Sequence, residues 1–388
     1  MTEGVERRKK LTDLIRNRID EDTFVGKYQA SVRKKLLFIL ALIIVAAVVF
    51  LFGVGLGSVN IPPLDTLKVF GHRMLPGIVG PPSKEYYSEF ILKSRLPRML
   101  LVVLTGFSLG VAGMIMQGLL RNPLVSPFTL GVSTAASFGA AVAIVIGSAM
   151  FGAFMNTALV LGSIRFEFDY LMKIVFAFGF AMISIGIILL LARGRHVSRS
   201  MIILAGVVIS YLFQAGLMAT KYISDDQQLR EITLWTMGSM DGATWGAIVL
   251  VLPVVVICSI YLFKMSMDIN ALSAGDEVAA NLGVDVHRLR KRGLIICTLI
   301  ASVCLAFTGV IGFIGLMAPH ICRMIIGNDS RYLMPASGLM GVVILAVSDL
   351  FCRLIIRPGA LPIGIVLYLV GGIFFIWMIS NRKWSQRV

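Results

Sequence analysis

The sequence is poor in charge. Only 15% of its 388 residues are Asp, Glu, Lys or Arg, whereas soluble domains carry about 25%. Hydrophobic residues make up 57% of the chain, and apolar runs of about 20 residues, the length that crosses a bilayer, recur along most of it. This composition excludes an ordinary soluble domain. It predicts an all-α, polytopic membrane protein, because helices satisfy their own backbone hydrogen bonds in lipid.

Ionisable side chains are nearly absent from the middle of the apolar runs. Such residues mark proton relays and ion pathways, so their scarcity disfavours a transporter driven by protons or Na⁺. The sequence also lacks the G-x-x-x-x-G-K-[ST] phosphate loop, and the chain is therefore not predicted to be an ATPase or another enzyme. We expect an energy source outside this chain. The alternatives are an ion-coupled secondary transporter and a non-transporting membrane scaffold or sensor.

Signals for metal and nucleic-acid binding are missing as well. The five cysteines form no C-x-x-C pair and have no metal-ligand spacing, so we expect small buried hydrophobes and no metal or other cofactor in this chain. The net charge of +15 is concentrated on one predicted side of the membrane, which argues for lipid rather than nucleic acid as the partner. The cysteines are Cys258, Cys297, Cys304, Cys322 and Cys352.

We predict about ten transmembrane helices. The apolar run 293–326 would be about 51 Å long as one helix, too long for one crossing. Basic residues flank both of its ends, so we expect two helices that turn near Gly309–Gly312. The stretch 333–380 should divide at Pro358–Pro362, a cluster of helix breakers. The other six predicted spans are 37–57, 99–119, 129–150, 171–192, 201–220 and 245–263.

Basic residues orient the spans. With the N-terminus inside, 24 of the 36 Lys and Arg residues fall in the predicted cytoplasmic segments, as the positive-inside rule requires. Both termini are then cytoplasmic. No secretory signal peptide is recognisable, and the first apolar run is predicted to be a retained span. We expect a cytoplasmic tail at 1–36, poorly ordered rather than a lipid-surface helix, a permease domain at 37–381 and a short cytoplasmic tail at 382–388.

The cytoplasmic loop of about 264–292 should contain a short helix near 268–284. Asp268 is the expected N-cap, and Gly283 the expected terminator, because glycine adopts the left-handed conformation that ends many helices. Asp285 is expected to cap the seventh span.

Several ordered motifs give the sequence a resemblance to a known family. They lie at Ser94–Arg98, Gln117–Pro127, Leu130–Ser133, Leu204–Gly206, Trp235–Ser239, Asn281–Val284, Gly309–His320 and Leu361–Gly364. Over roughly 37–381 the chain resembles the permease family of iron–siderophore and cobalamin ABC importers (FecCD-type, type II importers). The resemblance implies ten helices per subunit and a homodimer with the pathway at its interface. It also implies two cytoplasmic subunits that bind ATP and Mg²⁺, an extracytoplasmic substrate-binding protein, and a multi-pass location in the plasma membrane.

The resemblance also implies three groups of functional residues, each with a plainer alternative. The rim arginines would receive carboxylates of the binding protein, or simply snorkel to the interface. The cytoplasmic helix would couple to the ATPase, or rest on its own subunit. Two inner turns would gate the pathway, or be tight turns only, and Arg199 is bulkier than the small hydroxyl residue often found there. The docking residues are Arg95, Arg98 and Arg353. The coupling residues are Leu272, Gly275, Glu277, Val278, Leu282, Gly283 and Val284. The gate residues are Asn122, Leu124, Ser198, Arg199 and Ser200.

The cargo is the least determined feature. We expect an iron complex such as an iron–siderophore, because that is the commonest cargo of the family. Importers of cobalamin, haem and molybdate share the same motifs. His320 follows Pro319; a haem or metal ligand is one interpretation, and a structural histidine beside a helix bend is the preferred one.

Overall fold

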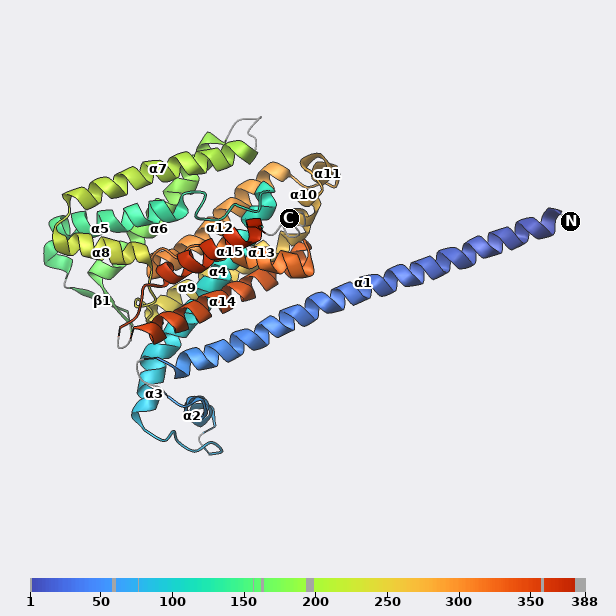
Figure 1. Ribbon diagram of the computed structural model, residues 1–388. Coiled ribbons are helices and arrows are strands. Elements are labelled where there is room, and N and C mark those ends of the chain that lie inside the picture. Colours follow the sequence, from blue (N-terminus) through green and yellow to red (C-terminus); the bar gives the residue numbers. More distant parts are fainter. Residues whose placement is uncertain are drawn as a thin grey trace.

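The computed structural model describes residues 2–57, 61–75, 77–155, 157–161, 164–192, 199–356 and 359–380. This part of the chain contains eight helices long and apolar enough to cross a membrane, and two shorter apolar helices at Val132–Gly147 and Ile314–Ile326. Together they confirm the predicted ten spans. The spanning helices (Figure 1) are α1 (Thr2–Gly55), α4 (Leu96–Leu120), α5 (Val132–Met155), α6 (Phe168–Leu191), α7 (Arg199–Ile223), α9 (Trp245–Lys264), α12 (Val286–Thr308), α13 (Ile314–Ile326), α14 (Ser330–Ile355) and α15 (Ile363–Ser380).

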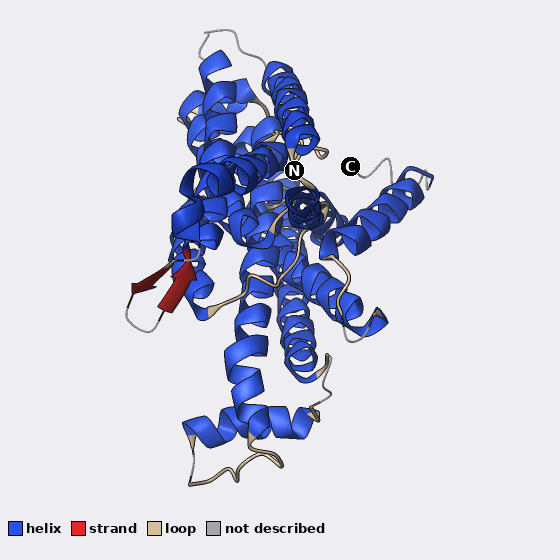
Figure 2. Cartoon of the chain, turned by 90° about the vertical axis from the view of Figure 1, so that its left-hand side faces the viewer, coloured by secondary structure: helices blue, strands red, loops and turns tan. Residues whose placement is uncertain are grey.

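Shorter elements connect the spans. A π-helix, η1, continues α3 into α4, so the chain is helical from Tyr86 to Leu120. A small antiparallel hairpin lies between α5 and α6, with Ala158 opposite Glu167 (Figure 2, red). It is a minor addition to the predicted all-α fold. The connecting elements are α2 (Pro63–Met74), α3 (Tyr86–Phe90), η1 (Ile91–Arg95), β1 (Ala158–Leu161), β2 (Ile164–Glu167), α8 (Asp226–Met237), α10 (Ser266–Ser273) and α11 (Asp276–Asn281).

Helix α4 forms the centre of the bundle. It lies among the other helices (Figure 1), packs against α14, α12, α13 and α9, and has most of its side chains buried. Glycines make this packing possible. A Cβ on Gly110 would lie 2.2 Å from the Ser337 carbonyl oxygen, and one on Gly113 would lie 1.9 Å from that of Gly315. Small residues are the usual means by which membrane helices approach this closely.

The two long apolar stretches divide where the sequence predicts. Helix α12 ends at Thr308, and Gly309 follows with φ +67°. A Cβ on Gly309 would lie 2.2 Å from the Trp235 carbonyl oxygen, so glycine is needed both for the conformation and for the space. Helix α14 ends at Ile355 and α15 begins at Ile363; Pro358 lies outside the described residues.

The N-terminal segment differs from the expected poorly ordered tail. Helix α1 runs without a break from Thr2 to Gly55, and Figure 1 shows its N-terminal part extending well beyond the bundle. The segment contains no proline, and each residue added to an existing helix gains one backbone hydrogen bond, so the first span can continue into polar sequence. The cytoplasmic location of 1–36 stays a prediction, and the tail at 382–388 lies outside the described residues.

Candidate functional site

Two arginines at the outer end of the bundle bind the C-terminal end of α1. Arg95 is buried, and its Nη1 donates hydrogen bonds to the carbonyl oxygens of Val54 and Gly55. The Nη1 of Arg353 donates to the carbonyls of Gly53 and Leu56, at 3.0 Å each. The last carbonyls of a helix lack partners within it and carry partial negative charge. Both arginines therefore cap α1.

Arg98 and Arg353 also share one buried carboxylate. Asp349 is fully buried, and its Oδ1 accepts hydrogen bonds from Nε and Nη2 of Arg98, at 3.0 and 2.9 Å. Its Oδ2 lies 2.9 Å from Nη2 of Arg353, one turn further along α14. The Nη1 of Arg98 lies 2.9 Å from Oδ1 of Asp241, a carboxylate that is 73% exposed. Buried charges need such compensation.

The structure brings the three predicted docking arginines together but makes them unequal. Arg95 and Arg353 are 4% and 9% exposed and are occupied inside the chain. Arg98 pairs with an exposed carboxylate, that of Asp241. A structural role for Arg95 and Arg353 follows from these contacts, while docking by any of the three stays a prediction.

The predicted cytoplasmic helix is two helices. Helix α10 ends at Ser273 and α11 begins at Asp276, with Gly275 between them at φ +134°. The single-helix expectation was wrong because this conformation, which L side chains rarely adopt, breaks the helix at a glycine. Asp268 lies in the first turn of α10 and is not its N-cap, which is Met265.

Two other predictions in this segment are confirmed. Gly283 has φ +86°. The Gly283 N–H donates to Ala280, and the Val284 N–H to Ala279, the hydrogen-bond pair of a Schellman motif that ends α11. Asp285 accepts a hydrogen bond from the Arg288 N–H and so caps α12.

Helices α10 and α11 are tied firmly to the spans. Arg290 donates two hydrogen bonds of 2.8 Å to the Asp276 carboxylate and one of 3.0 Å to the Leu119 carbonyl at the end of α4. Asn270 donates to Asp329 at 3.0 Å and accepts from the Ser330 N–H at 2.7 Å. Leu272, one of the predicted coupling residues, is completely buried. This burial packs α10 against the bundle, and a coupling role for Leu272 stays a prediction.

The Asp329 carboxylate is held in its charged form. Its burial acts to raise its pKa, but the hydrogen bonds from Arg331 and Asn270 outweigh burial and lower the pKa to about 2. Asp329 also caps the N-terminus of α14 through the Arg331 N–H. The connection between α10 and α14 therefore stays charged at physiological pH.

The remaining predicted coupling residues lie at the surface. Val278 and Leu282 are 44% and 68% exposed. Glu277 and Gly283 are also exposed, whereas Gly275 and Val284 are half-buried. Exposed apolar side chains on a firmly anchored helix form a surface suited to a protein partner.

The first predicted gate turn is well defined. Helix α4 ends at Leu120, and its C-cap residue, Arg121, adopts the left-handed conformation at φ +47°. The Asn122 side-chain oxygen then accepts the Leu124 N–H at 2.9 Å, and Leu124 is 58% exposed. This Asx turn exposes an apolar tip at the inner face.

The second gate turn is described only in part. Arg199 is half-buried and begins α7, and Ser200 is exposed; Ser198 lies outside the described residues. Gating by either turn stays a prediction.

His320 is packed as a structural residue. It is 2% exposed and lies among the rings of Phe374 and Phe375, with centroid distances of 6.1 and 6.2 Å. The described residues contain no group of three or more His, Cys, Asp or Glu side chains able to hold a metal ion. All five cysteines are buried and free, as predicted.

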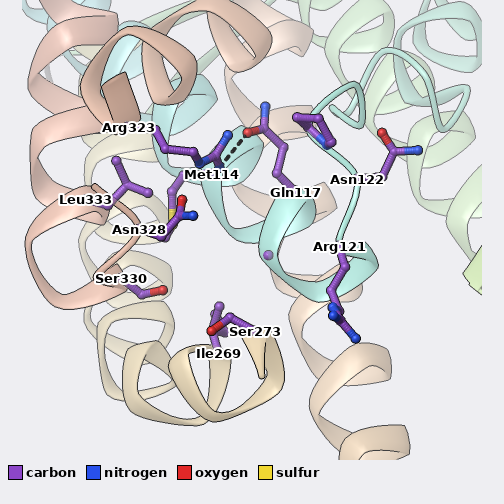
Figure 3. Close-up of a pocket in the computed structure, with 12 residues that line it drawn as sticks. Met114, Gln117, Arg121, Asn122, Ile269, Ser273, Arg323, Asn328, Ser330 and Leu333 are labelled. Carbon is purple, nitrogen blue, oxygen red and sulfur yellow. Dashed lines mark hydrogen bonds between the residues drawn. The ribbon is translucent and has the colours of Figure 1, made fainter. Parts of the chain in front are cut away.

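A cavity of about 240 Å³ with a mixed polar and apolar lining lies at the inner end of the bundle, beside α10, and was not predicted. Within it, Nη2 of Arg323 donates to Oε1 of Gln117 at 3.0 Å (Figure 3). The two residues are 206 positions apart, so no local pattern could join them.

These features define a polytopic membrane protein: a bundle of apolar helices with a partly apolar pair of short helices, α10 and α11, anchored at one end. Comparison with known proteins gives the particular family. The model of the FecCD transport family matches residues 42–381, and the chain belongs to this family. It is an ABC importer permease.

Individual relatives are similar in sequence to this chain along most of its length. It is 39% identical to a protein of Methanocaldococcus jannaschii described as an ABC transporter permease, over 91% of this chain and 97% of that one. It is 37% identical to the hemin transport system permease protein HmuU of Yersinia pestis, over 75% and 83%. It is 32% identical to the vitamin B12 import system permease protein BtuC of Vibrio vulnificus, over 89% and 94%.

A solved structure supports the fold. A metal-chelate type ABC transporter in an inward-facing conformation superposes with a TM-score of 0.72 at 25% identity, covering 87% of this chain and 96% of the other.

Proposed function

We propose that this chain imports a metal chelate across the plasma membrane, as the membrane-spanning subunit of a complex powered by ATP hydrolysis in partner subunits. One observation carries the proposal: the exposed apolar side chains of Val278, in α11, and Leu282, at its C-cap, belong to a helix that Arg290 ties directly to two spans. A solvated loop would not need that anchoring. A surface that receives force from a partner does need it.

The proposed assembly follows from both ends of the bundle. Two copies of the chain form a homodimer, and two ATP-binding cassette subunits, which bind ATP and Mg²⁺, dock on α10 and α11. An extracytoplasmic substrate-binding protein docks at the outer end, where Arg98 and its exposed partner Asp241 offer a charge pair at the surface. Charged contacts of this kind set register and association rate more than affinity.

The contacts of Arg290 suggest how force would be transmitted. Its guanidinium joins α11, through Asp276, to the Leu119 carbonyl in the last turn of α4, and it is itself part of α12. A displacement of α11 by the ATPase would then move the inner ends of two spans. The turn at Asn122 follows α4 directly and would move with it. This is the proposed link between ATP hydrolysis and the inner gate.

We propose an iron complex as the cargo. The relatives include the hemin permease HmuU and the Fe(3+)-citrate import permease YfmE of Bacillus subtilis, 30% identical over 91% of this chain. The similarity to vitamin B12 permeases makes cobalamin the second candidate. The ligand that co-purifies with the cognate binding protein decides between them: an iron chelate supports the proposal, and a corrinoid replaces it.

Reconstitution tests the mechanism. The permease is placed in proteoliposomes with its ATPase subunits and binding protein, and uptake of a radiolabelled iron chelate is measured. We expect uptake that requires ATP and the binding protein. Uptake by the permease alone, driven by a proton or Na⁺ gradient, would show a secondary transporter instead. Absence of any ATPase partner and of substrate-stimulated hydrolysis would favour a scaffold or sensor.

A further inference from the structure

The cavity at the inner end of the bundle has a mixed lining, apolar side chains such as Met114, Ile269 and Leu333 alternating with polar and basic ones. It lies between the end of α4, α10, the end of α13 and the start of α14. Its lining includes Arg121 and Arg323 together with Gln117, Ser273, Asn328 and Ser330, and it contains no Asp or Glu. Figure 3 shows Asn328 and Ser330 on the side of Arg323, Ser273 across the cavity, and Arg121 toward its edge.

Arg323 differs from several of the arginines near the span ends. Arg98, Arg290 and Arg331 each have a carboxylate partner. Among the residues that the structure describes, no carboxylate lies within 4.0 Å of the guanidinium of Arg323; its recorded hydrogen bond goes to the neutral Oε1 of Gln117. A guanidinium has five N–H donors, so most of its donor capacity remains for another group.

The neighbouring groups preserve this positive character. The Gln117 amide donates to the Gly315 carbonyl at 3.2 Å, which turns its oxygen toward Arg323. The nearby carboxylate of Asp329 is engaged by Arg331, Asn270 and Lys35. Among the described residues that line the cavity, no acidic group therefore neutralises the positive charge of Arg323.

We propose that this cavity binds a phosphate-type oxyanion through the guanidinium of Arg323. Guanidinium groups bind phosphate through two parallel hydrogen bonds. The surrounding amide and hydroxyl side chains come from α4, α10, α14 and the turn at Asn328, so hydrogen-bonding groups lie on several sides of the cavity. The phosphate is either a free ion or the headgroup of an anionic phospholipid. Once bound, it contacts α13 and lies beside both α10 and the end of α4, and so adds a link between the ATPase platform and the turn at Asn122.

Direct binding tests the site. The full chain is purified in nanodiscs of phosphatidylcholine, and binding of radiolabelled inorganic phosphate is measured by equilibrium dialysis at constant ionic strength. We expect Arg323→Gln to lower phosphate affinity by at least about tenfold. The matched control is Arg288→Gln, which removes a 73% exposed arginine on the same side of the protein; we expect it to bind phosphate as the wild type does.

A second pair of measurements identifies the source of the phosphate. If the headgroup of a lipid fills the cavity, nanodiscs of phosphatidylglycerol will lower the apparent affinity of the wild type for free phosphate, and Arg323→Gln will retain less of that lipid in native mass spectrometry. If free phosphate is the ligand, both lipids will give the same affinity. Either result supports the oxyanion site.

Three results would overturn the proposal. The wild type could bind neither phosphate nor phosphatidylglycerol. Arg323→Gln, folded as judged by gel filtration, could bind phosphate like the control. The site could instead bind an acidic side chain of the ATPase, in which case Arg323→Gln would weaken subunit association and the wild type would bind no phosphate.

Arg323→Lys, which keeps the charge, is used if the Gln variant does not fold, and a reduced phosphate affinity is expected there too. These measurements need no cargo and no ATP, so their outcome is separate from that of the proposed transport function.

Discussion

The arginines at the two ends of the bundle have different binding partners. At the outer end, Arg95, Arg98 and Arg353 are satisfied within the chain, by helix carbonyls or by Asp349. At the inner end, Arg323 lines an acid-free cavity, and apolar side chains of α11 are exposed. The outer cluster is thus built mainly for internal stability, and the inner face is left open to partners. Arginines at the two ends of the bundle therefore have different environments, and their contacts rather than their residue type distinguish them.

The largest expected effect comes from removing the shared carboxylate of the outer cluster. Asp349→Asn leaves Arg98 and Arg353 without their buried counter-ion, and breaking a buried ion pair from one side costs about 3–5 kcal/mol. We expect a loss of that size in the free energy of unfolding, measured on the purified protein by thermal or chemical denaturation. Asp241→Asn is the matched control, because its carboxylate is 73% exposed and should cost at most about 1 kcal/mol. Equal stability of the two variants would contradict an internally supported outer end.

The inner end should respond in the opposite sense. Leu282→Asp changes an exposed side chain, so we expect the stability of the purified chain to stay near that of the wild type. We expect association with the ATPase subunits to weaken by at least about tenfold, because an apolar contact at an interface is replaced by a charge. Pull-down or surface plasmon resonance measures the association.

Ile78→Asp is the control for that experiment. Ile78 is 80% exposed on the outer loop, so the same change of chemistry is made at the other end of the bundle. We expect it to leave ATPase association unchanged. If Leu282→Asp also left ATPase association unchanged, α11 would be an ordinary loop helix. The inner end would then not be a docking surface for the ATPase.

A smaller effect is expected at the anchor between α11 and the spans. Arg290→Ala removes the contacts with Asp276 and the Leu119 carbonyl. The exposed surface of α11 stays intact, so the ATPase should still bind and hydrolyse ATP, while the chelate transported per ATP falls severalfold. Arg288→Ala, which removes an exposed arginine two residues earlier, should keep the wild-type ratio. An unchanged ratio in Arg290→Ala would show that force reaches the spans by another route.

Local sequence signals predicted a large part of this arrangement. The spans, the turn at Gly309, the end of α11 at Gly283 and the cap at Asp285 each depend on residues close together in the chain, and all were found. The break at Gly275 was missed because a glycine is tolerated inside a helix at a cost of only about 1 kcal/mol. The helical start of α1 was missed because a polar composition is shared by surface helices and by solvated tails.

The long-range pairs could not be predicted. Arg98 and Asp349 are 251 positions apart, and Gln117 and Arg323 are 206 apart. Periodicity and spacing carry no information about such partners; they depend on how glycine-lined helices pack. The interpretation of the outer arginines as docking residues therefore rested on resemblance, and the structure reveals competing internal partners that the sequence could not.

The smallest expected effect sharpens the question of docking at the outer end. Asp241 occupies one side of the Arg98 guanidinium, where a carboxylate of the binding protein would otherwise bind. If Arg98 receives the binding protein, Asp241→Asn frees a positive group at the rim, and the association rate should rise a few-fold at low salt, because rim charges act mainly on association rates. The gain should fade near 1 M salt, where the Debye length is only about 3 Å. Stopped-flow measurements at two ionic strengths test this prediction. If neither the substitution nor the salt changes the association rate, Arg98 has only an internal structural role, like Arg95 and Arg353.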